Sequence, residues 1–178
     1  MFKLRQDVQE VQLRHALLDN SLTVKVGDIV APTADGDIVS NSTALTAGDK
    51  YVLGLVVGFC KQNGEVIGQG QDPSNTPNQL TTDADNTTGD KYHALYVPIT
   101  PEMEFSATLS DTAGTTTYSD KSFVWFNLSD CRTLDETSVL VANDNSAPLQ
   151  VFSFGLDPED TDNETVICRF AKSVMSRP

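Results

Sequence analysis

The sequence predicts a mainly β fold, a compact β-barrel or β-sandwich of eight to ten short strands with an N-terminal arm. Short apolar segments recur along the chain, and glycine, proline, asparagine and aspartate separate them. Several of these segments alternate apolar with polar residues, which is the period of a strand with one buried face. Many short strands joined by turn residues are typical of all-β barrels and sandwiches.

Ten segments carry these strand signals. In chain order they are residues 22–26, 29–30, 38–39, 51–60, 92–99, 105–109, 123–128, 139–141, 149–154 and 166–170. The strongest is YVLGLVVGFC, residues 51–60, whose apolar run is interrupted by Gly54 and Gly58. Glycines inside a strand predict β-bulges or a close approach of another backbone segment.

Two stretches are expected to form a turn and a loop. Asn63-Gly64 follows the strongest strand, and both residues tolerate positive φ, so a tight hairpin turn is predicted there. Residues 68–90 contain almost no apolar side chains and predict a long loop. Loops of this length are usually functional or disordered.

The sequence divides into an arm, residues 1–20, and a single β domain, residues 21–178. Apolar residues recur at near-helical spacing in the arm, but the pattern is short and has no clear cap. A helix and an extended segment that becomes ordered on a partner are therefore both open. A domain as long as the second part buries a core without a disulfide or a metal ion.

Charge excludes several classes of partner. The chain has 12 Lys and Arg against 25 Asp and Glu, a net charge of −13. Such a surface repels phosphate backbones and anionic lipid, so neither nucleic acid nor a membrane is expected as a partner. No uninterrupted apolar stretch marks a signal peptide or a membrane-spanning helix.

The sequence offers little for catalysis, so no enzyme, cofactor, metal or small-molecule substrate is expected. The only histidines are His15, in the arm, and His93. A hydrolase in which His93 approaches Cys60 is the weakest of the alternatives. Nothing near either residue in the sequence supports the pair, and catalytic groups are recognised by a geometry that the sequence does not give. The three cysteines, Cys60, Cys131 and Cys168, are expected to be buried free thiols.

Two acidic loops leave calcium binding open. Carboxylates gather at residues 83–90, with Asn86 among them, and again at residues 157–164. Calcium takes six to eight oxygen ligands, which such loops can supply. Neither loop has the spacing of an EF-hand, and a solvated acidic loop is the simpler interpretation.

Three segments carry a resemblance to a known family: LTVKVGDIVAPTADGDIV, GDKYVLGLVVGFC and HALYVPITPEMEFSATLSD. The matching positions are Val26, Gly27, Asp28 and Val30; Gly54, Val56 and Gly58; and Val97, Pro98, Thr100, Pro101, Phe105 and Ala107. In these the chain resembles the head decoration, or cement, proteins of tailed bacteriophages, loosely over residues 22–130.

The resemblance implies a structural virion protein, made in the host cytoplasm and located on the outer capsid surface. Such proteins, commonly homotrimers, clamp neighbouring major capsid proteins and so stabilise the shell. The apolar residues of the arm have no obvious core of their own and are the expected partner contacts: Phe2, Leu4, Val8, Val11, Leu13, Leu17 and Leu18. Deleting residues 1–20 is accordingly expected to leave a folded body that no longer binds its assembly.

A receptor- or carbohydrate-binding β module of a phage tail or fibre is the alternative. It shares the all-β texture rich in threonine, asparagine and glycine. A sugar site would need exposed aromatic residues beside polar side chains, and Trp125 and Tyr118 are the candidates. Trp125 lies within FVWFNL, however, where a core position is the simpler expectation.

Overall fold

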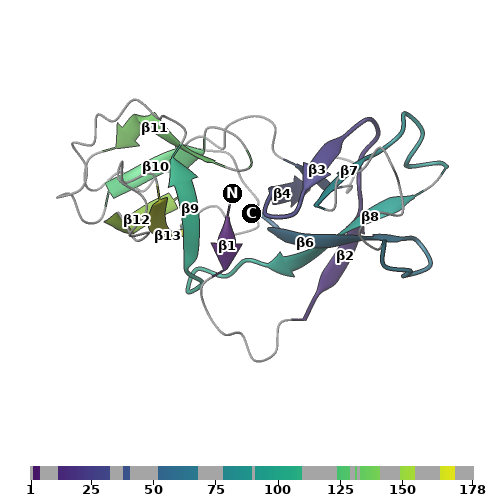
Figure 1. The fold of residues 1–178 in the computed structure, drawn as a ribbon, viewed down its shortest axis with the longest axis horizontal. Helices are drawn as coiled ribbons and strands as arrows, with labels where there is room; N and C mark the ends of the chain where they lie inside the picture. The colour runs from purple at the N-terminus through teal and green to yellow at the C-terminus, as the bar shows by residue number, and fades with distance from the viewer. Residues whose placement is uncertain are drawn as a thin grey trace. The chain divides into compact units, whose positions relative to one another are not determined.

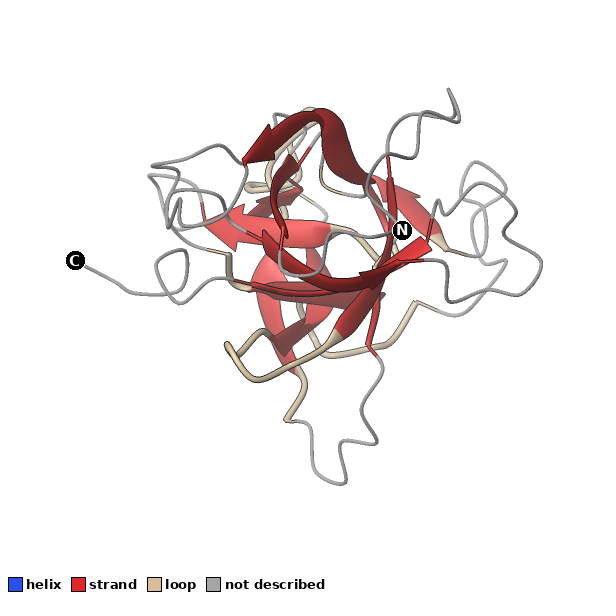
Figure 2. Cartoon of the chain, turned by 90° about the vertical axis from the view of Figure 1, so that its left-hand side faces the viewer, coloured by secondary structure: helices blue, strands red, loops and turns tan. Residues whose placement is uncertain are grey.

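The computed structural model describes eleven stretches of the chain: residues 2–4, 12–32, 38–40, 52–67, 78–89, 91–109, 124–128, 131, 133–140, 149–154 and 165–170. These residues form thirteen strands and no helix (Figure 2), which confirms the mainly β fold. Each of the ten expected strands overlaps an observed one. The other three, β1 (Lys3–Leu4), β2 (Arg14–Leu17) and β7 (Gln79–Thr81), were not expected.

The chain folds as two compact units. Unit 1 comprises Met1–Asp7, Asn41–Tyr51 and Ile99–Pro178, and unit 2 comprises Val8–Ser40 and Val52–Pro98. The segment expected to be an arm contributes one strand to each unit, and the expected single domain is divided between them.

Unit 1 is built on a ring of paired strands. Its strands are β1, β9 (Phe105–Leu109), β10 (Val124–Leu128), β11 (Thr133–Leu140), β12 (Leu149–Phe154) and β13 (Thr165–Phe170). The pairing order β9-β11-β10-β12-β13 closes because β13 also pairs with β9. Closure removes the free edges that an open sheet would expose, and it agrees with the expected barrel.

The core of unit 1 follows from alternation along its strands. In β13, Val166, Cys168 and Phe170 are buried, whereas the residues between them are half-buried. The other buried apolar residues of the unit are Phe2, Ile99, Phe105, Ala107, Cys131, Leu134, Leu149 and Val151.

Strand β1 adds to β9 inside unit 1. It pairs with Phe105 and Ser106, beside β9 in Figure 1. Phe2, the residue before it, is 1% exposed, and its ring lies 6.4 Å from that of Phe105 and 5.7 Å from that of Phe170, centroid to centroid. Aromatic pairs at these separations are favourable beyond their buried area. Phe2 therefore anchors a strand of only two residues.

Unit 2 contains a five-stranded antiparallel sheet in the order β2-β8-β6-β4-β5. Its strands, besides β2, are β4 (Ile29–Pro32), β5 (Ile38–Ser40), β6 (Gly54–Lys61) and β8 (Tyr92–Pro98). A separate pair joins β3 (Thr23–Lys25) to β7.

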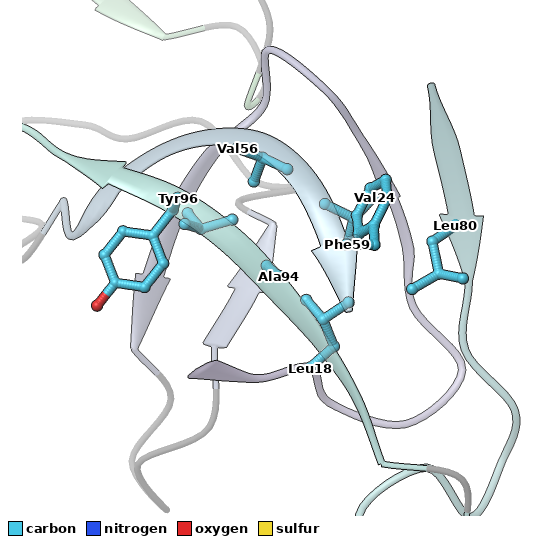
Figure 3. Close-up of a cluster of buried hydrophobic side chains, with 8 residues drawn as sticks. Leu18, Val24, Val56, Phe59, Leu80, Ala94 and Tyr96 are labelled. Carbon is cyan, nitrogen blue, oxygen red and sulfur yellow. The ribbon is translucent and has the colours of Figure 1, made fainter. Parts of the chain in front are cut away.

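One apolar cluster connects the two sheets of unit 2. Leu18, at the end of β2, and Leu80, in β7, both point into it (Figure 3). Its buried members are Leu18, Val24, Val30, Val56, Phe59, Leu80, Ala94 and Tyr96. Because both sheets contribute, the cluster fixes the short strands β3 and β7 against the longer ones.

The glycines of β6 meet the two expectations for them. A Cβ on Gly54 would lie 2.5 Å from the carbonyl oxygen of Val97 and would clash with the Tyr96 ring, so this glycine permits a close approach. The register between β6 and β8 shifts between Val56 and Gly58, which is the expected bulge. The Asn63-Gly64 turn is also confirmed, with positive φ at Gly64 alone.

The expectation of a loop over residues 68–90 is wrong for part of that range. Of these residues the structure describes 78–89, and β7 lies among them. Leu80, the one apolar side chain of that strand, is 2% exposed and pairs in register with Val24. The hydroxyl groups of Thr81 and Thr23 lie 3.1 Å apart across the pair. A single buried leucine thus suffices to hold a polar strand.

Candidate functional site

The candidate functional site is the edge of the unit 2 sheet formed by β2. β2 pairs antiparallel with β8, from Arg14 opposite Tyr96 to Leu17 opposite His93. Among the described residues β2 has β8 as its only strand neighbour, so no described strand covers its other side. We call this side the open edge of β2.

Alternation decides which backbone groups face the open edge. The N–H of Leu18 donates to the carbonyl oxygen of Tyr92, at 3.0 Å, so Leu18 forms a hydrogen-bonded pair with β8. In an antiparallel ladder every second residue is bonded in this way. Ala16 therefore faces β8 with its N–H and C=O, whereas His15 and Leu17 direct theirs outward.

A buried asparagine holds the end of β2 against the start of β8. The Nδ2 of Asn86 donates to the carbonyl oxygen of Leu18 at 2.6 Å and to that of Tyr92 at 3.2 Å. Its Oδ1 accepts from the N–H of Tyr92 at 2.8 Å. Asn86 is fully buried, so each of these bonds satisfies a group that water does not reach.

The two histidines of the chain meet on this edge. His15 in β2 and His93 in β8 are diagonal neighbours in the ladder, and their Nδ1 atoms lie 3.2 Å apart. The ring centroids are 5.3 Å apart. His15 is exposed and His93 is half-buried, on the face opposite the buried Ala94 and Leu18.

The surroundings of His93 disfavour its charged form. Burial is the main cause of a lowered pKa, and the positive charges of His15 and Lys91 add to it. Lowering the pKa of a histidine means that the fold accommodates the neutral ring better than the cation.

Cys60 does not supply a nucleophile beside His93. The register places the two residues opposite each other on β6 and β8, so His93 does approach Cys60, as the hydrolase alternative required. The thiol is 2% exposed, however, and burial raises its pKa. The thiolate is the nucleophilic form, and this site disfavours it. Cys131 and Cys168 are buried as well and are not joined in a disulfide.

The expected partner contacts of the arm fall into separate groups. Phe2 and Leu18 are buried in the cores of units 1 and 2, so the expectation that the arm has no core within the chain is wrong for them. Leu4 and Leu17 are half-buried, and Leu13 is 55% exposed. Val8 and Val11 lie outside the described residues. Partner binding by these residues stays a prediction.

The other sequence candidates are only partly described. Asp83 and Asp85 are exposed, but Asn86 uses its side chain within the fold. Asp90, residues 157–164 and Tyr118 lie outside the described residues. Trp125 lies in β10, and its backbone pairs with Leu140 of β11 and Gln150 of β12.

Within the described ranges, no three or more His, Cys, Asp or Glu side chains come together as metal ligands would. The same ranges hold no helix that is long and apolar enough to cross a membrane. No protein family, no curated protein and no solved structure was found to match the chain.

Proposed function

We propose that the chain is a structural protein of a tailed bacteriophage that binds the outer capsid surface. There, as a homotrimer, it clamps neighbouring major capsid proteins and stabilises the shell. The observation that carries the proposal is the open edge of β2, which is suited to adding a strand from another protein. The resemblance of the sequence to cement proteins supplies the identity of that partner.

Strand addition uses the groups that the open edge presents. The backbone N–H and C=O of His15 and Leu17 face outward, and main-chain hydrogen bonds to such groups provide affinity in β-augmentation. Leu13, 55% exposed directly before the strand, offers an apolar contact beside them. An exposed edge with an apolar neighbour is the arrangement that free proteins usually protect.

Charge favours the same orientation. The chain carries a net charge of −13, yet residues 1–25 hold four basic and three acidic residues. The segment that contains β2 is thus close to neutral, while the rest of the chain is acidic. An acidic body directed to solvent keeps particles apart, and a near-neutral edge approaches another protein without strong repulsion.

Stabilisation of the shell follows from mass action. A protein that binds the assembled shell, and not the unassembled subunits, lowers the free energy of the shell by an amount that grows with its concentration. The stabilisation of the shell then depends on the binding free energy between the open edge and a strand that only the assembled shell presents.

The test uses a proline that blocks the open edge alone. Proline is tolerated on an edge strand where its missing N–H would face solvent, and the N–H of Leu17 is such a group. We expect Leu17→Pro to keep the β circular dichroism spectrum and to lose co-sedimentation with expanded shells of the major capsid protein of the encoding phage. The matched control, Leu17→Ala, removes the side chain but keeps the N–H and should still bind.

Two results would contradict the proposal. One is a folded, unmodified chain that does not co-sediment with these shells or raise their melting temperature. The other is a monomer by size-exclusion chromatography with light scattering at the concentrations that saturate the shells. Undiminished binding by Leu17→Pro would instead leave the cement function standing and move the contact away from β2.

A further inference from the structure

We propose that the His15–His93 pair is a protonation-sensitive latch: when both rings are protonated to the imidazolium cation, β2 detaches from β8. The latch itself is a property of unit 2 alone. Its consequence for shell binding rests on the proposed function, because the same strand carries the open edge.

The geometry permits one proton between the rings but not two. At 3.2 Å, an Nδ1–H of one ring can donate to the bare Nδ1 of the other. A neutral pair satisfies this, and so does a pair with one imidazolium as donor. When both rings are imidazolium cations, two Nδ1–H donors and two positive charges face each other without an acceptor between them. The second proton is therefore the one that breaks the pair.

Within the described part of the chain, no neighbouring group offsets the second charge. The titratable or charged groups that face His93 are His15 from β2, Cys60 from β6 and Lys91 at the start of its own strand. Lys91 is a cation, and the buried Cys60 thiol has a raised pKa, so it stays uncharged. The lowered pKa of His93 has burial as its first cause and these cations as the others, in agreement with the geometry.

The strand that yields is β2. It has four residues and, among the described strands, is paired on one side only, whereas β8 lies between β2 and β6 and pairs with both. Repulsion that rotation of the exposed His15 ring does not relieve therefore acts on the β2–β8 ladder, where β2 has fewer bonds to lose than β8. Leu18 and Asn86 oppose the opening, since both fix the end of β2.

The direction of the pH dependence follows from the lowered pKa of His93. In the detached state the ring returns toward its ordinary pKa of 6.5, so detachment takes up a proton. Docking of β2 is complete above that pH and weakens as the pH falls through 6.5 toward the lowered value. Each unit by which the fold lowers the pKa corresponds to about a tenfold change in the docking equilibrium.

The pair by itself does not make a metal centre. Two imidazole nitrogens at this separation could share an ion, but zinc sites in proteins take three or four protein ligands. In the part of the chain that the structure describes, no third histidine, cysteine or acidic side chain completes such a group. Protonation is the chemistry that the pair supports without a further ligand.

Amide hydrogen exchange of the unmodified chain tests the latch. The N–H of Leu18 is bonded to β8, and the N–H of Val56, in the same unit, is bonded to the carbonyl oxygen of Asp28 at 2.9 Å. Between about pH 7.5 and about pH 5, where Asp and Glu stay largely ionised, we expect the protection factor of Leu18 to fall about threefold or more. That of Val56 should change less, because β6 does not detach.

Three variants sharpen the test. His93→Gln removes the ring whose pKa the fold lowers, so the pH dependence at Leu18 should become several-fold smaller. His15→Gln removes the pair but leaves the burial of His93, the main cause of its lowered pKa, so the dependence should fall by a smaller factor. Thr23→Ala removes a hydroxyl pair across β3 and β7 that does not titrate, and it should leave the dependence unchanged. Equal loss of protection at Leu18 and Val56, or the same dependence in His15→Gln as in the unmodified chain, would overturn the latch. Neither outcome depends on whether the chain binds a shell.

Discussion

The two strands of the N-terminal segment, β1 and β2, are held in different ways. Strand β1 has two residues and depends on Phe2, whose ring is 1% exposed and packs against those of Phe105 and Phe170. Strand β2 has four residues and depends on Leu18, which is fully buried, and on the amide of Asn86. One strand is fixed by aromatic burial, the other by a leucine and a polar clamp.

The difference separates structural from accessible residues within one short segment. β1 leaves little to a partner, because its anchor is inside unit 1. β2 packs the half-buried Ala16 against the core and keeps an open edge, a histidine pair and Leu13, which is 55% exposed. An apolar residue in a terminal segment is thus no sign of a partner contact by itself. Each residue has to be assigned by the core it enters or leaves free.

The largest effect is expected from Phe2→Ala, which breaks the β1 half of the comparison. Removing a fully buried phenylalanine costs about 3–5 kcal/mol of unfolding free energy, because contacts are lost and a cavity remains. Urea unfolding followed by the fluorescence of Trp125, the one tryptophan and part of unit 1, measures it. Leu4→Ala, in the same strand but half-buried, is the matched control and should cost less. Equal midpoints for Phe2→Ala and the unmodified chain would show that β1 is dispensable.

Leu18→Ala should be the next largest and should act on unit 2. The loss of a fully buried leucine costs about 3 kcal/mol. Amide exchange at Val56, in the core of unit 2, reports it directly. Leu17→Ala, one residue earlier and half-buried on the other face, should have a smaller effect. The loss of unfolding free energy in Leu18→Ala could be as large by the Trp125 fluorescence of unit 1 as by amide exchange at Val56 in unit 2. In that case the two units would unfold together, and their strands could not be compared separately.

Most of the strands could be predicted from the sequence, because each carries its own pattern. The alternation of Val166, Cys168 and Phe170, or the apolar run around Val56, is visible within a few residues of chain. β1, β2 and β7 could not be predicted in this way. Each has two to four residues and contains no valine or isoleucine, unlike the equally short β3, β4 and β5, and each forms only because a distant strand pairs with it.

The candidate site depends still more on distant pairing. His15 and His93 are 78 residues apart in the sequence and meet only through the register of β2 on β8. The role of Asn86 was equally hidden, because its neighbours Asp83 and Asp85 made it look like part of an acidic loop. Burial converts the same amide into a clamp on Leu18 and Tyr92. The sequence around His15 gives no clear alternation, because Ala16, Leu17 and Leu18 are all apolar.

Asn86→Asp tests the polar clamp with almost no change of shape. The aspartate loses both N–H donors and places oxygen against the carbonyl oxygens of Leu18 and Tyr92. Leaving a buried neutral group unpaired costs about 2 kcal/mol, and the buried carboxylate must in addition either stay charged without a partner or bind a proton. The protection factor at Leu18 measures the loss, and Asp85→Asn, an exposed neighbour with the reverse change, should leave it unaltered. A variant Asn86→Asp as protected at Leu18 as the unmodified chain would rule out the clamp.

The smallest effect on stability is expected from Leu13→Ser, and here the comparison becomes useful for function. A substitution at a side chain that is 55% exposed should change the unfolding free energy by no more than about 0.5 kcal/mol. Phe2→Ala and Leu18→Ala weaken the fold, so any loss of shell binding in them has two explanations. Loss of co-sedimentation in a stable Leu13→Ser chain has only one, a contact at the open edge of β2. If Leu13→Ser bound shells normally while Leu17→Pro did not, the backbone edge would be the contact and the leucine beside it would be incidental.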